Sequence, residues 1–382
     1  SDAIPYLMVA FYFFGITLGF LMPLDLSFSL WFFFFIYLAE RVVCRGLGYE
    51  PNQTLFTTDQ AFGAFSTIGI SVLLGARRHL VAALRCAWRP DGMDAEEPFS
   101  YRSTFVVLGI SILVMFCFLM AAGASAVVTF GFILIIMMLA LVISRIRAEL
   151  GFPVHDLQAM GPNAVLTRLF GTVGMSKASL GMLTVTYWAE RAHRSHPAPH
   201  MIESAKLAAG SKLAGRDMLR AITLAGIVAI PLSFIIYLEG FYRLGVATAK
   251  INLGGVGYGA EAFNKLEIWM RAPEPVQAGH WVGMLVGILI SGVLILVRGR
   301  VIGFPLHPLG FAVYSSWGVW QLWLPILIGS IAKAVALKVG GLKTYRKATM
   351  FFFGLMLGEL VIGCLWQLVG MAFQVRTYDF WP

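Results

Sequence analysis

The chain has 382 residues, of which 58% are hydrophobic and 13% are charged, against about 45–50% and about 25% in average soluble domains. A water-soluble globule of this size could not bury so much apolar surface, so composition excludes a soluble enzyme and a disordered chain. The excess of 29 Lys and Arg over 20 Asp and Glu indicates cytoplasmic loops and anionic lipid headgroups rather than nucleic acid. The composition therefore predicts a polytopic membrane protein with membrane lipids as partners.

The first part of the chain, residues 1–145, carries a series of apolar runs that approach the roughly 20 residues needed to cross a bilayer. A cytoplasmic loop near 77–103 interrupts this series, and it includes a basic amphipathic stretch at Leu80–Trp88. The first residue is Ser1, and the apolar run follows almost at once, so we expect the chain to begin inside a longer polypeptide. The predicted spans are Ile4–Met22, Leu26–Cys44, Leu55–Leu74, Thr104–Ala122 and Ala126–Ile143.

Residues 146–220 form a discontinuous, polar segment that is expected to re-enter the membrane and to include a surface helix over Pro199–Asp217. Residues 221–382 are predicted to hold the C-terminal transmembrane helices. The spans predicted for this part of the chain are Met218–Leu238, His280–Val297 and Ala348–Phe373, with one short helix near Ala262–Met270.

The segment 303–337 is apolar for longer than one helix requires, yet prolines and glycines interrupt it. Basic residues bracket it on both sides, so the positive-inside rule places both ends in the cytoplasm. The sequence therefore predicts a re-entrant hairpin of two half-helices. Since backbone polar groups in lipid must be satisfied, the predicted fold is an all-α transmembrane bundle of about eight to ten membrane-inserted segments, with broken or re-entrant helices.

Glu359 is the first candidate functional residue, because it lies near the middle of the last predicted span. An ionisable group at that depth costs about 2.5–3.5 kcal/mol, and such a group commonly faces a partner or a cavity. Gly354 and Gly358, four residues apart, predict a smooth groove on the same helix. Glu359 is interpreted either as a proton-loading acid or as a structural carboxylate bonded to a neighbouring helix.

A second candidate cluster follows the predicted span that ends at Ile143, where Gly151 and Pro153 are expected to stop the helix. Glu149, His155 and Asp156 are predicted to line a substrate or ion pathway, because transporters place such sites beside non-helical backbone. The alternative is a cytoplasmic cap, and we favour that interpretation for Arg145 and Arg147. The residues predicted to anchor the chain to headgroups are Arg145, Arg147, Arg298, Arg300, Lys343, Arg346 and Lys347.

The third candidate cluster lies in the predicted hairpin. His307, Ser315 and Ser316 offer a ring nitrogen and two hydroxyls where unwound turns expose backbone carbonyls. These three residues are predicted to bind a polar ligand or ion, and the alternative for His307 is a helix cap.

Several known kinds of site are missing from the sequence. It contains no nucleophile elbow, H-E-x-x-H motif or P-loop, so we predict neither an enzyme nor a cofactor. The four cysteines form no C-x-x-C pair, and no metal site is expected.

Four stretches resemble one protein family: His307–Phe311, Ser316–Gly318, Gly340–Ala348 and Gly354–Glu359. Arg147–Pro153, Pro5–Leu7 and Pro23–Ser29 share the resemblance. Together they are similar to an uncharacterised family of bacterial integral membrane proteins related to the oligopeptide transporter superfamily. The resemblance implies a two-repeat bundle with embedded hairpins and cation-coupled uptake of peptides or metal chelates. The superfamily's peptide-binding motifs are not apparent, which leaves the substrate open.

Two functional hypotheses follow. The first is a secondary active transporter in the bacterial inner membrane, coupled to a cation such as the proton and moving a small polar solute. The second is a non-transporting subunit or scaffold of a larger membrane complex, which the exposed-type aromatics of Phe32–Phe35 favour. A homodimer is compatible with the first hypothesis, and stoichiometric partner chains are expected from the second.

Overall fold

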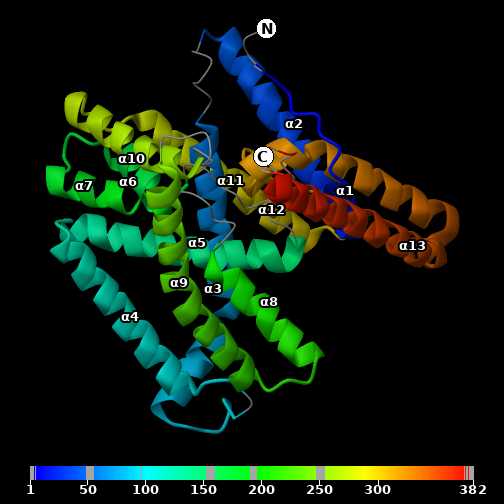
Figure 1. Cartoon of the computed structure of the whole chain (residues 1–382), viewed down its shortest axis with the longest axis horizontal. Coiled ribbons are helices and arrows are strands. Elements are labelled where there is room, and N and C mark those ends of the chain that lie inside the picture. Colours follow the sequence, from blue (N-terminus) through cyan, green and yellow to red (C-terminus); the bar gives the residue numbers. More distant parts are fainter. Residues whose placement is uncertain are drawn as a thin grey trace. The chain divides into compact units, whose positions relative to one another are not determined.

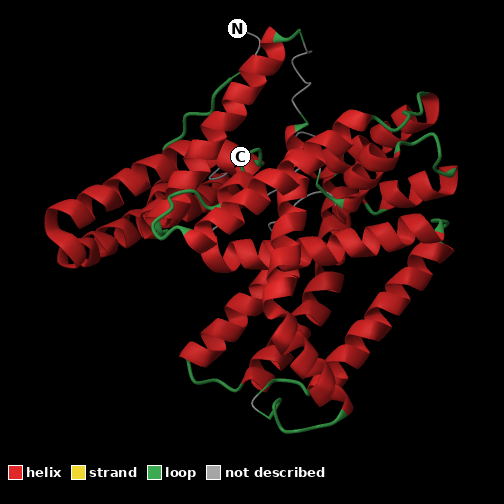
Figure 2. Cartoon of the chain, turned by 180° about the vertical axis from the view of Figure 1, so that it is seen from behind, coloured by secondary structure: helices red, strands yellow, loops and turns green. Residues whose placement is uncertain are grey.

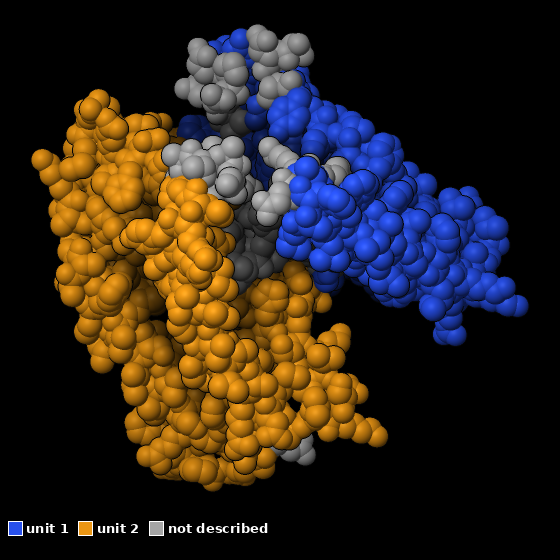
Figure 3. Space-filling view, viewed as in Figure 1, with its two compact units in different colours: residues 1–68, 149–157, 282–382 blue, residues 69–148, 158–281 orange. Residues whose placement is uncertain are grey.

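The computed structural model describes residues 4, 6–48, 56–95, 97–151, 160–189, 196–246, 254–373, 375 and 377, without the side chains of 150 and 254–256. Throughout these ranges the regular structure is helical, and no residue lies in a strand (Figure 2). The chain divides into two compact units (Figure 3). Unit 1 comprises residues 1–68, 149–157 and 282–382, and unit 2 comprises 69–148 and 158–281.

Unit 1 is built around a long helix that folds back on itself. This helix, α13, bends at Gly341, whose φ of +59° lies in the left-handed region that favours glycine. The bend separates two arms, and Figure 1 shows α13 running outward and back with α1 beside it. The helices of unit 1 are α1 (Phe13–Leu21), α2 (Leu24–Gly46), the start of α3 (Thr57–Trp88), most of α11 (Ala278–Arg300), α12 (Pro308–Ala312) and α13 (Trp317–Phe373).

Unit 2 holds the remaining helices, and two of them expose nearly all of their side chains. Helix α9 (Gly215–Leu244) has no buried residue, and α4 (Tyr101–Ala121) buries only Leu119. Such apolar, unburied surfaces are typical of helices that face lipid. The other elements are the rest of α3, α5 (Ala126–Leu150), α6 (Pro162–Phe170), α7 (Lys177–Val185), η1 (Tyr187–Ala189), α8 (Pro197–Gly210) and α10 (Gly254–Arg271).

Within the described ranges, seven helices are long and apolar enough to cross a membrane: α2, α3, α4, α5, α9, α11 and α13. The prediction of a polytopic helical membrane protein is therefore confirmed at this level. The number of such helices differs from the expected eight to ten, partly because the two arms of α13 are counted as one helix.

The first predicted span, Ile4–Met22, is wrong in extent. Its helix is confined to Phe13–Leu21, and Tyr6–Tyr12 is not helical. Hydrogen bonds between this segment, α1 and α13 secure this part of the chain. The indole Nε1 of Trp323 donates to the Met8 carbonyl at 2.7 Å, and the Thr17 hydroxyl donates to the Phe352 carbonyl at 2.8 Å.

Other expected boundaries also differ from the structure. The surface helix expected over Pro199–Asp217 ends at Gly210 in α8, and Gly215–Asp217 belong to α9. The expected span Leu55–Leu74, from Thr57 on, and the stretch Leu80–Trp88 belong to one helix, α3. The short helix expected near Ala262–Met270 extends over all of α10. The segment 303–337 contains the five-residue α12 and then a continuous helix from Trp317, rather than two half-helices. Pro325 lies inside that helix without ending it, which is tolerated where neighbouring helices satisfy the freed carbonyl.

Close helix crossings in unit 1 depend on glycine. A Cβ at Gly287 of α11 would collide with the backbone of Gln60 in α3, and one at Gly329 of α13 would collide with the backbone of Ile16 and Phe20. Small residues allow backbones to approach closely where lipid removes the hydrophobic drive for helix association. These crossings therefore fix the positions of α1 and α3 within unit 1.

We expect Gly287→Ala to destabilise the protein by about 1–3 kcal/mol, because the added methyl group overpacks a backbone contact. Gly292→Ala is the matched control, since a Cβ at this position of the same helix meets no atom within 4 Å. That change should be neutral or stabilising by up to about 1 kcal/mol. Thermal unfolding of both variants in detergent measures the difference, and equal stability would contradict the close crossing.

Candidate functional site

The N-terminal end of α1 is bonded to an acid of α13. A carboxylate oxygen of Glu359, Oε2, accepts a hydrogen bond from the backbone N–H of Phe14 at 2.6 Å. The first N–H groups of any helix have no partner inside the helix, and a negative charge there also interacts favourably with the helix dipole. Glu359 therefore bonds to a backbone amide of a neighbouring helix. This contact is close to the second interpretation from the sequence, a structural carboxylate bonded to a neighbouring helix.

The C-terminal end of α1 is bonded to a lysine of the same partner helix. Lys333 Nζ donates to the carbonyl oxygens of Leu21 and Met22 at 3.2 and 2.5 Å. Its side chain is buried, and its ammonium lies 5.1 Å from the centroid of the Tyr345 ring. The positive charge at this end complements the dipole in the same sense as Glu359 does at the other. Sequence analysis missed Lys333, although it is a lone charge within an apolar stretch.

Glu359 also lines a cavity of about 770 Å³ between α1 and the second arm of α13. A Cβ at Gly354 or Gly358 would meet no atom within 4 Å. The predicted smooth face therefore lines open space, and no described backbone packs on it. The lining residues are Phe11, Phe13, Met350, Phe351, Gly354, Leu355, Gly358, Glu359, Ile362, Gly363 and Trp366.

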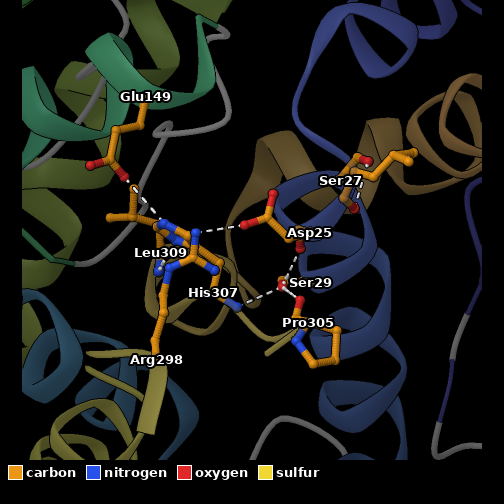
Figure 4. Close-up of polar contacts among 9 residues, drawn as sticks. Asp25, Ser27, Ser29, Glu149, Arg298, Pro305, His307 and Leu309 are labelled. Carbon is orange, nitrogen blue, oxygen red and sulfur yellow. Dashed lines mark hydrogen bonds and ion pairs between the residues drawn. The ribbon is translucent and has the colours of Figure 1, made fainter. Parts of the chain in front are cut away.

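A second polar cluster surrounds the non-helical segment before α12 (Figure 4). Arg298 Nη2 lies 2.6 Å from Asp25 Oδ2, and His307 Nε2 lies 3.4 Å from Glu149 Oε2. The hydroxyl of Ser29 accepts from the backbone N–H of His307 at 2.7 Å and lies 3.1 Å from the Pro305 carbonyl. The cluster therefore places two carboxylates and two basic side chains beside unwound backbone.

The structure brings together only some of the residues proposed from the sequence. His307 and Glu149 contact each other, whereas Glu359 contacts α1.

Two residues of the third cluster form helix caps. His307 Nδ1 accepts from the Leu309 N–H at 3.2 Å, which is the helix-cap alternative. Ser316 Oγ accepts from the Val319 N–H at 3.2 Å at the start of α13. Ser315 is half-buried in the same turn. His155 and Asp156 lie outside the described residues.

Two of the arginines assigned to lipid anchoring are ion-paired. Arg298 pairs with Asp25, and Arg147 Nε lies 2.5 Å from Glu203 Oε1 of α8. The other five basic residues of that group have exposed side chains: Arg145, Arg300, Lys343, Arg346 and Lys347.

A third polar cluster was missed by sequence analysis. Glu40 of α2 lies 3.4 Å from the amide nitrogen of Gln60 and 3.4 Å from the hydroxyl of Tyr314. Glu40 precedes Arg41 and Arg45 near the end of α2, so in sequence it resembles part of a charged helix end. Tyr314 is remote from Glu40 in the chain, and only tertiary structure shows that it is fully buried beside this acid.

A cavity of about 790 Å³ in unit 2 has a different character. Apolar and aromatic side chains such as Leu139, Tyr187 and Phe263 line it, together with His196. Burial lowers the pKa of His196, and the charge of His200 adds to the shift, so His196 is neutral at pH 7. Among the described lining residues none carries a charge that would select a polar solute.

We expect Lys333→Met to free the last carbonyls of α1. Loss of one buried partner leaves acceptors unsatisfied at about 1–3 kcal/mol, so amide hydrogen exchange in Phe13–Leu21 should become faster. Lys338→Met is the matched control, because Lys338 lies further along the same arm with an exposed side chain. Unchanged exchange in α1 of the Lys333 variant would contradict the capping role.

Comparison with family models matches residues 2–382 to one family described as of unknown function, DUF6785. Comparison with curated proteins and with solved structures found no match. Since the matched region covers nearly the whole sequence, the chain belongs to the DUF6785 family.

Proposed function

We propose that the chain is a cation-coupled secondary transporter of the oligopeptide-transporter type, which moves a small polar solute such as a peptide or a metal chelate. The observation that carries this proposal is the double role of Glu359, which caps a short embedded helix and lines an adjoining cavity. Ionisable residues inside apolar helices mark ion and substrate pathways more often than other positions do.

Helix α1 has the dimensions of a half-helix. Its nine residues span about 14 Å at 1.5 Å per residue, against a hydrocarbon core of about 30 Å. Transporters build their sites from such discontinuous helices, because the free backbone groups at the breaks bind charge. In this chain the free groups at both ends of α1 are held by Glu359 and Lys333.

The Glu359 contact suggests how cation binding is coupled to movement. A proton on Glu359 removes the negative charge that interacts with the N-terminus of α1, which weakens the hydrogen bond from Phe14. A ligand shifts a conformational equilibrium only by its differential affinity for the two states. Protonation therefore favours conformations in which α1 has left Glu359, and the ionised acid favours the docked state.

The cluster around His307 supplies the polar surface that a solute requires. Asp25 and Glu149 are negative, Arg298 is positive, and each carboxylate lies beside a basic side chain. A zwitterionic peptide or an anionic chelate presents charges of both signs, so it can exchange with these pairs along unwound backbone. His155 and Asp156 belong to the same proposed path from sequence. Residence in the bacterial inner membrane is part of the proposal and follows from the family resemblance.

Glu359→Gln tests the coupling role, because the amide oxygen of glutamine still accepts the Phe14 N–H while the titratable proton is lost. We expect proteoliposomes with this variant to lose at least about 90% of pH-gradient-driven uptake, since Gln cannot load a proton. Internal pH, read by a trapped dye, is followed as short peptides and metal chelates are added.

The matched control is Glu239→Gln, since Glu239 is an exposed acid of α9 paired with Arg243 at 3.1 Å. It should retain uptake. Full coupled uptake by the Glu359 variant would remove the coupling role, and no uptake by the wild-type chain with any tested solute would remove the transporter proposal.

A second candidate function is a non-transporting subunit of a larger complex. The observation in its favour is α9, an apolar helix of 30 residues with no buried side chain, which offers a long surface to lipid or to another chain. Native mass measurement after gentle solubilisation distinguishes the two. Stoichiometric partner chains support the subunit, whereas a monomer or homodimer that still transports supports the carrier.

A further inference from the structure

Glu40, Gln60 and Tyr314 form a closed ring of polar atoms inside unit 1. Gln60 Nε2 and Glu40 Oε2 are 3.4 Å apart, Tyr314 Oη and Glu40 Oε2 are 3.4 Å apart, and Tyr314 Oη and Gln60 Oε1 are 3.4 Å apart. The three groups come from α2, α3 and the turn between α12 and α13. We call them the Glu40 ring.

The ring is sheltered by packing on several sides. Tyr314 is fully buried, Gln60 is 5% exposed and Glu40 is half-buried. The Tyr314 ring lies 5.8 Å from that of Tyr37 and 4.9 Å from that of Phe311. Gly287 of α11 closely approaches the backbone of Gln60 itself. A charge in such surroundings is costly unless a partner of opposite charge compensates it.

Few of the charged and titratable groups in the described part of unit 1 surround the ring. On α2, Arg41 contacts the Tyr37 hydroxyl at 3.2 Å, and on α3, Asp59 is buried next to Gln60 in sequence. The arm of α13 packed on α2 contributes the rings of Trp320 and Trp323, and α11 contributes glycine at its approach to Gln60. The atoms that touch Glu40 in the ring are an amide and a phenol, both uncharged donors.

Counting protons distinguishes the two states of Glu40. With the carboxylate ionised, the ring has only the amide and phenol protons, and the phenol has a single proton to give either to Glu40 or to Gln60. Two donated protons are then available for the three contacts of the ring. A proton on Glu40 Oε2 supplies the third, so that Gln60 donates to Glu40, Glu40 donates to Tyr314 and Tyr314 donates to Gln60.

We propose that Glu40 is a proton-binding site of this protein, in which a proton on Oε2 completes the third contact of the Glu40 ring. The site is separate from Glu359 and has a different chemistry, because Glu359 contacts a backbone N–H at a helix end. It rests on the proposed function only in that a proton bound here would be a coupling ion; the binding itself requires no transport.

The experiment uses a membrane-permeant hydrophobic carbodiimide on the full chain in proteoliposomes, followed by peptide mapping. A protonated carboxyl adds across one C=N bond: its oxygen bonds to the central carbon, its proton moves to nitrogen, and no group leaves. We expect Glu40 to be modified near pH 6, with labelling at least about tenfold lower near pH 9, since each pH unit past the midpoint lowers the protonated fraction about tenfold. Glu239→Gln should leave that labelling unchanged, and Glu40→Gln should abolish it.

Three outcomes would overturn the inference: Glu40 unmodified near pH 6, labelling independent of pH, or labelling suppressed more than about tenfold by Na⁺ at constant pH, which would indicate a bound metal ion. Because labelling needs no substrate, a failure of uptake leaves this result readable. Conversely, intact uptake with unlabelled Glu40 rejects the proton site and retains the transporter.

Discussion

The attachment of α1 to α13 is the contact on which the rest of unit 1 depends. A nine-residue helix in an apolar environment leaves N–H groups at one end and carbonyl groups at the other, and lipid cannot satisfy either set. Glu359 and Lys333 lie on the two arms of α13 and reach the two ends of α1. The left-handed conformation of Gly341 makes this possible, because it lets one helix return past the same neighbour.

The same requirement explains the second break. Around Pro305 and His307 the chain is not helical, and the hydroxyl of Ser29 contacts both the Pro305 carbonyl and the His307 amide. The apolar side of α12 is secured by rings, since Phe311 lies 5.4 Å from Phe33. A Cβ at Gly310 would be 2.6 Å from that of Ser29, so α12 and α2 approach as closely as their backbones permit.

Three acids of unit 1 differ in what surrounds them, and this difference separates their proposed roles. Asp25 faces a guanidinium, Glu359 faces the N–H of a helix end, and Glu40 faces an amide and a phenol. A guanidinium holds its partner as a carboxylate over the physiological range. A helix end interacts with the charge but tolerates its loss, and uncharged donors leave the proton count of the carboxyl open.

Apolar run length and charge distribution predicted the membrane class, the helical architecture and most of the long spans, because both follow directly from the cost of placing polar groups in lipid. The sequence also identified Glu359, His307 and the break near Pro305, since lone charges and prolines are visible in an apolar run. Where helix α1 begins and which groups meet depend on helix packing, which no local pattern encodes. Phe14 and Glu359, Met22 and Lys333, and Glu40 and Tyr314 are each hundreds of residues apart in the chain, and Gln60 reaches Glu40 from the next helix, α3.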